Sequence, residues 1–265
     1  MDADERGLLE ETLRKTMTTT APGRELDAAL ADLGWADMLA EEPTMAIPVV
    51  FRLLGETGAH APVLNDVVLL SAGRPPGGVL PLPYAGGLWV TWARDAAAEE
   101  NALDPGPPLR CVDPGDPVPL AEGHRALGWW LLGTGRAMLA LARGHVLSRH
   151  QFGRPLASFQ ALRHRLAETY VALEGAEAVL AAAGNDTGAL LAKAAAGRAA
   201  LTAARHCQQA LGGIGFTAEH DLHRHVKRAL VLDGLLGSSR ELTRAAGASL
   251  LRLPRAPRLV DLVDL

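Results

Sequence analysis

The strongest constraint on the fold is a series of apolar-periodic segments over residues 121–250. Leucine, methionine and alanine recur there at intervals of three and four, which places their side chains on one helix face. Breaks at Gly184-Asn185-Asp186 and Gly212-Gly213 are typical stop signals. Helices of roughly 20 to 30 residues joined by short turns are typical of a helical bundle. The expected helices lie near 127–147, 156–183, 190–211 and 221–251, the last with a weak point at Gly234 and Gly237.

Two zones precede this bundle. Residues 1–73 have the pattern of shorter helices, with breaks at Pro22-Gly23 and between Pro43 and Pro48. Residues 74–120 are so rich in proline and glycine that long helices are excluded, and short strands joined by turns are favoured, at 88–92 and 109–112. The predicted fold class is mainly α, with N-terminal helices (1–73), a reduced middle β segment (74–120) and a C-terminal four-helix bundle (121–265).

Composition excludes several classes of protein. Of the 265 residues, 48% are hydrophobic and 21% charged, which is a globular composition. A net charge of -4 does not favour a nucleic-acid partner or an anionic membrane surface. There is no long uncharged apolar stretch that predicts a membrane span, and the acidic N-terminus is unlike a signal peptide. Cys111 and Cys207 stand far apart, which excludes a disulfide framework and favours a cytoplasmic location.

Two motifs in the bundle region point to chemistry. The first is Arg149-x-x-Phe152-Gly153, and the second is Gln209-x-x-Gly212-Gly213-x-Gly215-Phe216. A guanidinium at a helix end is a rigid fork of donors that can grip a phosphate. Glycines at a helix junction let backbone N–H groups approach an anion closely. The Gln209 amide can hold a ribose or an adenine edge.

Both motifs resemble the C-terminal domain of the acyl-CoA dehydrogenases, the flavoenzymes that desaturate acyl-CoA thioesters. The resemblance implies an FAD cofactor whose ADP end is clasped, often across a subunit interface. It assigns cofactor binding to Arg149, Phe152, Gln209, Gly212 and Gly213. The alternative interpretation makes Phe152 a core anchor and the glycine pair only a turn.

The catalytic base is where this sequence departs from the family. Many members carry a Glu-Gly-Thr triplet, whose glutamate removes the Cα proton and whose threonine lies near the flavin. The matching residues here are Leu236-Gly237-Ser238, so Ser238 is a cofactor candidate but no base is present. Other members place the base on the first bundle helix, at a position that falls near Gly123. Its neighbour Glu122 is the candidate base, although one residue turns a helical side chain by about 100° and directs it away.

The middle zone also departs from the family. Leu88-Trp89-Val90-Thr91 is similar to a strand whose aromatic and hydroxyl side chains contact the flavin, which makes Trp89 and Thr91 cofactor candidates. The alternative for both is a packed strand. Residues 74–120 are too few for the family's larger β-domain, so strands that would complete a flavin pocket are missing.

A metal site is not expected. His220 and His223 share one face of a helix, but His225 points elsewhere, so three-ligand geometry fails.

Three functions compete at this point. The first is an acyl-CoA dehydrogenase-like flavoprotein subunit that contributes to α,β-desaturation of an acyl-CoA thioester. It would be the base-lacking partner in an oligomer with a longer subunit, as in actinobacterial heteromers of fatty-acid or sterol side-chain metabolism. The second is a repurposed protein of the same fold, with a non-redox or ligand-binding role in a biosynthetic pathway and no FAD. The third is a self-sufficient dehydrogenase with Glu122 as its base.

Overall fold

The computed structural model describes residues 3–95 and 102–252. Five helices come first: α1 (Ala3–Thr19), α2 (Arg24–Asp32), α3 (Trp35–Glu41), α4 (Pro43–Thr57) and α5 (Leu64–Ser71). Three strands follow: β1 (Pro81–Tyr84), β2 (Leu88–Trp92) and β3 (Leu109–Cys111). The rest comprises α6 (Ala121–Ser148), β4 (His150–Gln151), β5 (Arg154–Pro155), α7 (Gln160–Ala182), α8 (Asp186–Leu211), α9 (Leu222–Gly234) and α10 (Ser239–Leu250).

The predicted fold class is confirmed: the chain is mainly helical, with a small antiparallel sheet in strand order β1-β2-β3. Strands β2 and β3 occupy the two segments that the middle zone predicts. The division into domains at residues 73 and 120 stays a prediction. Within the described residues, no helix is both long and apolar enough to cross a lipid bilayer.

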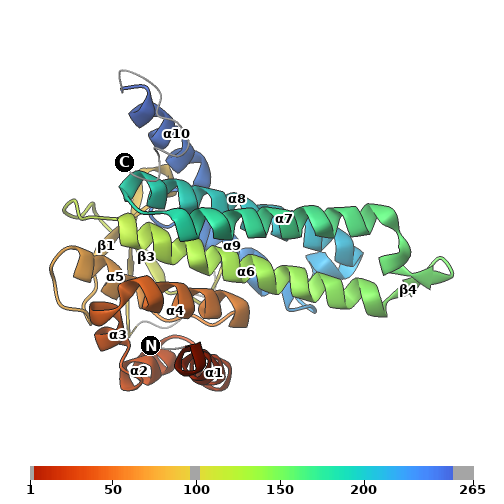
Figure 1. The fold of residues 1–265 in the computed structure, drawn as a ribbon, viewed down its shortest axis with the longest axis horizontal. Helices are drawn as coiled ribbons and strands as arrows, with labels where there is room; N and C mark the ends of the chain where they lie inside the picture. Colours follow the sequence, from red (N-terminus) through yellow and green to blue (C-terminus); the bar gives the residue numbers. More distant parts are fainter. Residues whose placement is uncertain (1–2, 96–101, 253–265) are drawn as a thin grey trace.

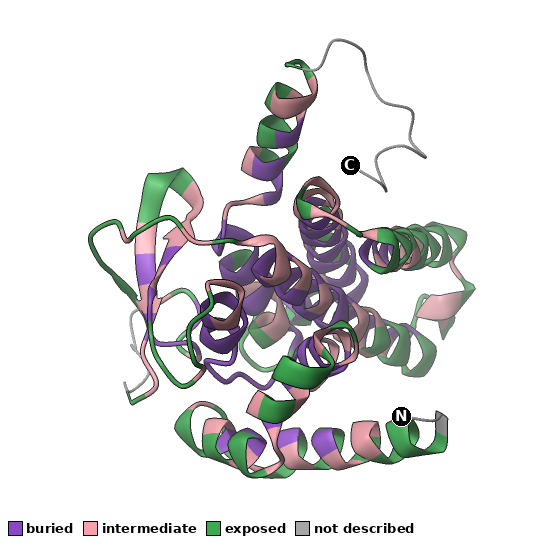
Figure 2. Ribbon diagram, turned by 60° about the vertical axis from the view of Figure 1, so that its left-hand side comes forward, coloured by how far each residue is buried: buried purple, intermediate pink, exposed green. Residues whose placement is uncertain are grey.

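Helix α6 is the central element of the fold. It packs against α4 on one side and against α7, α8 and α9 on the other. Its buried residues include Trp130, which stacks on Trp92 of β2 at 5.6 Å between ring centroids and meets Phe51 of α4 edge-to-face. The buried residues therefore form one continuous core that joins the N-terminal helices and the sheet to the bundle (Figure 2).

Two sequence expectations need correction. Helix α4 runs without a break through Pro48, because the carbonyl that loses a hydrogen bond belongs to exposed Thr44, near the helix start. The fourth bundle helix is split into α9 and α10. Leu236 (φ 55°) and Gly237 (φ 95°) are both left-handed, which ends α9 at the predicted weak point. Helix α10 then leaves the bundle (Figure 1).

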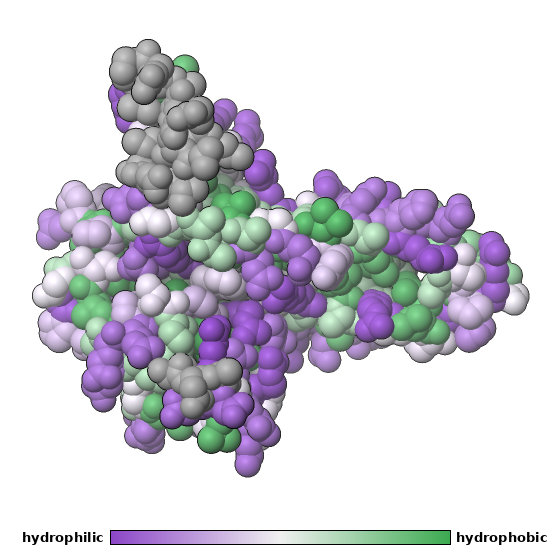
Figure 3. Space-filling model, in the orientation of Figure 1, coloured by the Kyte–Doolittle hydropathy of each residue, from purple (hydrophilic) through white to green (hydrophobic). Residues whose placement is uncertain are grey.

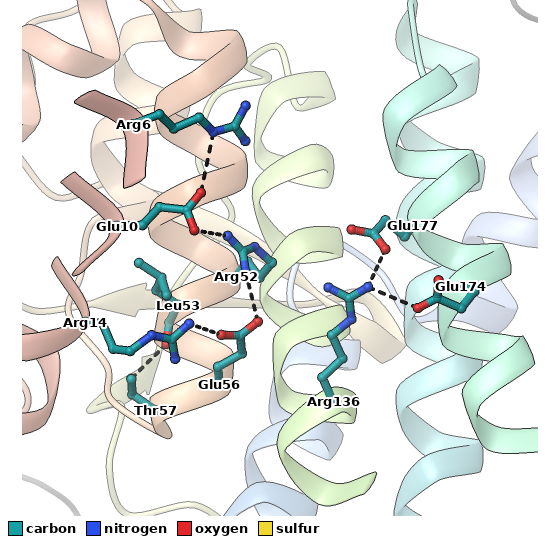
Figure 4. Close-up of polar contacts among 10 residues, drawn as sticks. All are labelled: Arg6, Glu10, Arg14, Arg52, Leu53, Glu56, Thr57, Arg136, Glu174 and Glu177. Atoms are coloured by element: carbon teal, nitrogen blue, oxygen red, sulfur yellow. Dashed lines mark hydrogen bonds and ion pairs between the residues drawn. The ribbon is translucent and has the colours of Figure 1, made fainter. Parts of the chain in front are cut away.

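Ion pairs attach the N-terminal helix to the fold. Arg52 of α4 donates to Glu10 of α1 at 2.8 Å and to Glu56 at 3.1 Å. Arg14 of α1 donates to the other oxygen of Glu56 at 2.6 Å. Figure 4 shows that Arg52 and Glu56 of α4 lie between Glu10 and Arg14 of α1. A separate pair of contacts joins α6 to α7, where Arg136 lies between Glu174 and Glu177.

Glycines allow α4 and α6 to touch backbone to backbone. A Cβ at Gly133 would lie 2.1 Å from the Arg52 carbonyl oxygen, and one at Gly55 would lie 2.4 Å from the Trp130 carbonyl oxygen. Neither distance is possible for a real side chain. The spacing of the two helices therefore requires glycine at both positions.

One end of the bundle projects beyond the rest of the molecule. This arm consists of the C-terminal end of α6, the β4–β5 hairpin, the start of α7, and the end of α8 with the short turn Gly212–Phe216. Figure 3 shows apolar surface along it. Exposed apolar side chains of the arm include Leu147, Phe152 and Phe216.

Replacing Gly133 by alanine should destabilise the chain by about 2 kcal/mol or more, because the backbones of α4 and α6 would have to separate. Gly144 lies on the same helix, and a Cβ there would meet no atom within 4 Å. Gly144→Ala should instead be neutral or stabilising by up to about 1 kcal/mol. Urea denaturation of both variants measures the difference, and equal midpoints would contradict the contact.

Candidate functional site

Four of the predicted cofactor residues lie together on the arm. Arg149 follows directly after α6, where extended backbone (ψ 127°) ends the helix. Gln209 lies in the last turn of α8, and Gly212 ends that helix with a φ of 65°. They border a pocket of about 390 Å³. Its lining is His145, Arg149, Gln151, Leu156, Leu162, Gln209, Ala210, Leu211, Gly212, Gly213 and Ile214.

The polar groups of this pocket are available to a ligand. Arg149 and Gln209 are both exposed, and neither side chain has a bonding partner among the described residues. A Cβ at Gly213 would meet no atom within 4 Å, so the glycine leaves the pocket wall open. A free guanidinium, a free amide and a glycine turn form a donor set that suits a diphosphate and its attached nucleoside. The pocket therefore fits the ADP end of a dinucleotide.

Phe152 does not anchor the core. It lies at the tip of the β4–β5 hairpin, is 86% exposed and has a φ of 57°. Its only ring contact among the described residues is with Phe159, edge-to-face at 6.0 Å. The core-anchor alternative is therefore wrong, and Phe152 stands beside the pocket without lining it.

The two family positions for a catalytic base meet at the opposite end of α6. A Cβ at Gly123 would lie 2.7 Å from Leu236 Cδ1 and 3.1 Å from Val68 Cγ2. Leu236 is only 2% exposed. Both positions are thus occupied by residues that cannot take a proton, in a packed apolar contact.

Glu122 lies on another face of α6. Its carboxylate pairs with Arg125 one turn along the helix. Both residues line a separate cavity together with Trp129 and Leu180, away from Leu236. The helical register therefore separates Glu122 from the site where the family's base acts.

The remaining cofactor candidates lie at the sheet end of the molecule. The Ser238 hydroxyl caps α10 and donates to Glu241 Oε2 at 2.7 Å. Glu241 also accepts from Gly86 N at 2.8 Å, and these hydrogen bonds lower the pKa of its carboxyl. Trp89 and Thr91 are half-buried on β2, on the face opposite the buried Val90 and Trp92.

Sequence reasoning missed a buried polar cluster behind Leu236. Lys193 of α8 is fully buried, and its Nζ donates to the Asp233 carbonyl at 2.8 Å and to the Gly237 carbonyl. His124 of α6 donates from Nε2 to the Leu236 carbonyl at 3.1 Å. These two side chains thus satisfy the inward-facing carbonyls of the α9–α10 junction.

Burial also sets the protonation of the cluster. It lowers the pKa of Lys193 to about 7 and that of His124 to about 4. The Asp233 carboxylate accepts from Ser239 N at 3.1 Å and so caps α10. The sequence did contain a signal for this cluster. Lys193 is the one charged residue in an alanine-rich segment before Gly197, and small residues of this kind are typical of a helix face that packs closely against its neighbours.

The two ends of the candidate site are far apart within one chain. Helix α6 has 28 residues, and at 1.5 Å per residue it is about 40 Å long. Gly123 and the sheet lie at its start, and Arg149 follows its end (Figure 1). No group of three His, Cys, Asp or Glu in the described part of the chain is arranged to hold a metal ion.

Comparisons with known proteins identify the family of the chain. Residues 120–251 match the family model of the acyl-CoA dehydrogenase C-terminal domain. Acyl-CoA dehydrogenase IpdE2 of Mycobacterium tuberculosis is 38% identical over 172 residues, which cover 60% of this chain and 53% of that protein. Acyl-CoA dehydrogenase FadE34 of the same organism is 35% identical over 193 residues, covering 63% of this chain and 27% of that protein. The chain thus spans about half or less of the length of these relatives.

Solved structures show the same fold. Glutaryl-CoA dehydrogenase from Mycobacterium smegmatis superposes with a TM-score of 0.73 at 17% identity, covering 97% of each chain. A chain of the ChsE4-ChsE5 complex from Mycobacterium tuberculosis superposes with a TM-score of 0.65 at 19% identity, covering 96% of this chain and 100% of that one.

The buried amine predicts a pH-dependent stability. Between pH 7 and 10.5, the unfolded chain binds more protons at Lys193 than the folded chain does. The free energy of unfolding therefore rises with pH across that window. Lys193→Met removes this contribution, so the wild-type chain should gain stability over the variant as the pH rises.

Urea denaturation at several pH values between about 7 and 9.5 measures this difference. Lys227→Met, at a half-buried position on α9, is the control and should run parallel to the wild-type chain. Parallel profiles for Lys193→Met and wild type would show that the amine does not titrate in this range.

Proposed function

The chain belongs to the acyl-CoA dehydrogenase family, and on this basis we propose that it is the base-lacking subunit of a heteromeric, FAD-dependent enzyme. In this role its arm clasps the ADP end of an FAD whose flavin end lies in a longer acyl-CoA dehydrogenase subunit. The partner supplies the carboxylate for α,β-desaturation of an acyl-CoA thioester.

The observation that carries this proposal is the length of α6. The donors suited to a diphosphate follow one end of the helix, and the positions matching the flavin and base sites lie at the other, about 40 Å away. One extended dinucleotide does not bridge that distance within a single chain. A cofactor held by Arg149 must therefore have its flavin end in another subunit.

On the arm, each residue has a defined task. The Arg149 guanidinium would hold the diphosphate, the Gly212-Gly213 turn would present backbone N–H groups, and the Gln209 amide would bind the nucleoside. Bound FAD supplies the acceptor for the hydride that leaves Cβ of the thioester. The chain's own contribution is to bind and orient the ADP end.

The packing at Leu236 supports a division of labour. Removing the Cα proton of a thioester requires a carboxylate within reach of that carbon. Leu236 and Gly123 provide none, and Glu122 is ion-paired on another face. The proton must therefore be taken by a residue of the partner.

The arm surface and the relatives both support an assembly of different subunits. Leu147, Phe152 and Phe216 of the arm are exposed apolar side chains, and subunit interfaces bury side chains of this kind. One structure of the same fold is a ChsE4-ChsE5 complex, and another is a Tcur3481-Tcur3483 steroid enzyme. Both names describe pairs of different chains.

Flavin absorbance of the purified protein tests the proposal. The chain purified alone should be colourless, and the same chain co-expressed with a longer, glutamate-bearing acyl-CoA dehydrogenase of its own organism should purify as a yellow complex. Arg149→Ala should lower the flavin content of that complex several-fold, because a charged hydrogen bond to phosphate is lost. Arg198→Ala, an exposed arginine in mid α8, should leave the flavin content unchanged.

A yellow chain that needs no partner would contradict the division of the site between subunits. A chain that stays colourless in every combination would favour the repurposed, non-redox alternative. Unchanged flavin in Arg149→Ala would remove the arm pocket from the cofactor site.

Glu122 offers a second prediction. Glu122→Gln should leave reduction of an artificial electron acceptor by the complex within about twofold of wild type, since its pairing with Arg125 keeps it from the thioester. The substitution preserves shape and removes the charge, and a steady-state assay measures the rate. Loss of activity with flavin still bound would restore Glu122 as a base.

A further inference from the structure

A second cavity, of about 640 Å³, lies where α4, α6 and the start of α9 meet. It collects three imidazoles (His145, His220 and His225) and two guanidiniums (Arg224 and Arg228). On its α6 side the lining is mostly small, with Ala137, Ala140 and Gly144 spaced at three and four residues. This stripe leaves the floor of the cavity unfilled.

Only one of the two arginine side chains of the cavity has bonding partners within the described structure. Arg228 is buried, pairs with Asp104 and donates to the Ala59 carbonyl at 3.0 Å. Arg224 is exposed at the rim and has no bonding partner among the described residues. One guanidinium is therefore fixed in the wall, and the other is free to bind a ligand.

The carboxylates of the lining do not cancel this charge. Both oxygens of Glu56 are held from the far side, by Arg52 at 3.1 Å and Arg14 at 2.6 Å. Asp221 is exposed at the N-terminal end of α9 and forms no ion pair with Arg224.

The imidazoles lie in a buried, positively charged environment that the Asp221 carboxylate offsets only in part. His225 Nδ1 is buried without a hydrogen-bond partner in the described structure. Burial, and then the neighbouring Arg228 and Arg224, lower the pKa of His225 to about 4. Burial, His220 and Arg149 lower the pKa of His145. An anion placed beside Arg224 would offset the electrostatic repulsion among these groups.

We infer that this cavity is a second anion site, which binds a dianionic phosphoryl group through Arg224 and the imidazoles of His220 and His225. The ligand class is a phosphate ester or free phosphate. His145 lines both this cavity and the arm pocket, so the two sites adjoin. The new site uses its own cation and does not depend on FAD.

The imidazole resonances of His220 and His225 in ¹H–¹⁵N NMR spectra report binding at this cavity, because neither residue lines the arm pocket. Titrating the purified chain with sulfate, a stable dianion, should shift the signals of His220 and His225. Arg224→Ala should weaken sulfate binding about tenfold or more, the usual effect of losing a charged hydrogen bond. Arg244→Ala, an exposed arginine on α10, should leave the affinity unchanged.

Arg149→Ala separates the two sites. This variant should leave the sulfate-induced shifts of His225 intact and lower the flavin content of the complex. Arg224→Ala should weaken the sulfate-induced shifts and leave the flavin content unchanged. A parallel titration with ADP distinguishes a nucleotide from free phosphate as the source of the phosphoryl group. ADP binding that ignores Arg224→Ala would show that nucleotides use only the arm pocket.

The pH dependence gives an independent readout. Sulfate keeps its charge between pH 6 and 8, so any change in affinity comes from the protein. The titratable and charged groups facing the ligand are Glu56 of α4, His145 of α6, and His220, Asp221, Arg224, His225 and Arg228 of the α9 segment. Binding raises the pKa of an imidazole, so sulfate should bind more tightly at pH 6 than at pH 8. No shift at His225, or an affinity unaffected by Arg224→Ala, would refute the site.

Discussion

The backbone contact between α4 and α6 at Gly55 and Gly133 sets the spacing between the N-terminal helices and the bundle. It brings the N-terminal helices directly onto the bundle, with no space for larger side chains between them. The aromatic side chains of Phe51, Trp130 and Trp92 then continue the same core into the sheet. Both the small β segment and the α9–α10 junction are held against the start of α6 by this packing.

The polar cluster at that junction stabilises a backbone shape that sequence alone does not specify. Leu236 is left-handed, which costs a non-glycine residue about 1 kcal/mol or more. Lys193 and His124 offset this cost by satisfying the carbonyls that the turn directs inward. The geometry of the turn is thus maintained in a chain that carries no acid at this position.

Local signals made the arm predictable from the sequence. A helix stop before Arg149 and a glycine pair after Gln209 are short-range features, and both lie as the sequence indicates. The helix break at residues 235–238 was visible only as a weak point, because Leu236 in a left-handed conformation has no sequence signature. The buried Lys193 and the cavity at Arg224 depend on contacts between helices distant in sequence, which periodicity does not encode.

The length of helix α6 also fixes the distance between the two ends of the candidate site. Its 28 residues contain no proline, and it packs against α4, α5, α7, α8 and α9. Whatever chain shares a ligand with the arm must present its own half of the binding surface at that fixed reach. Under the proposed function, a partner must therefore match this distance as well as the surface chemistry of the arm.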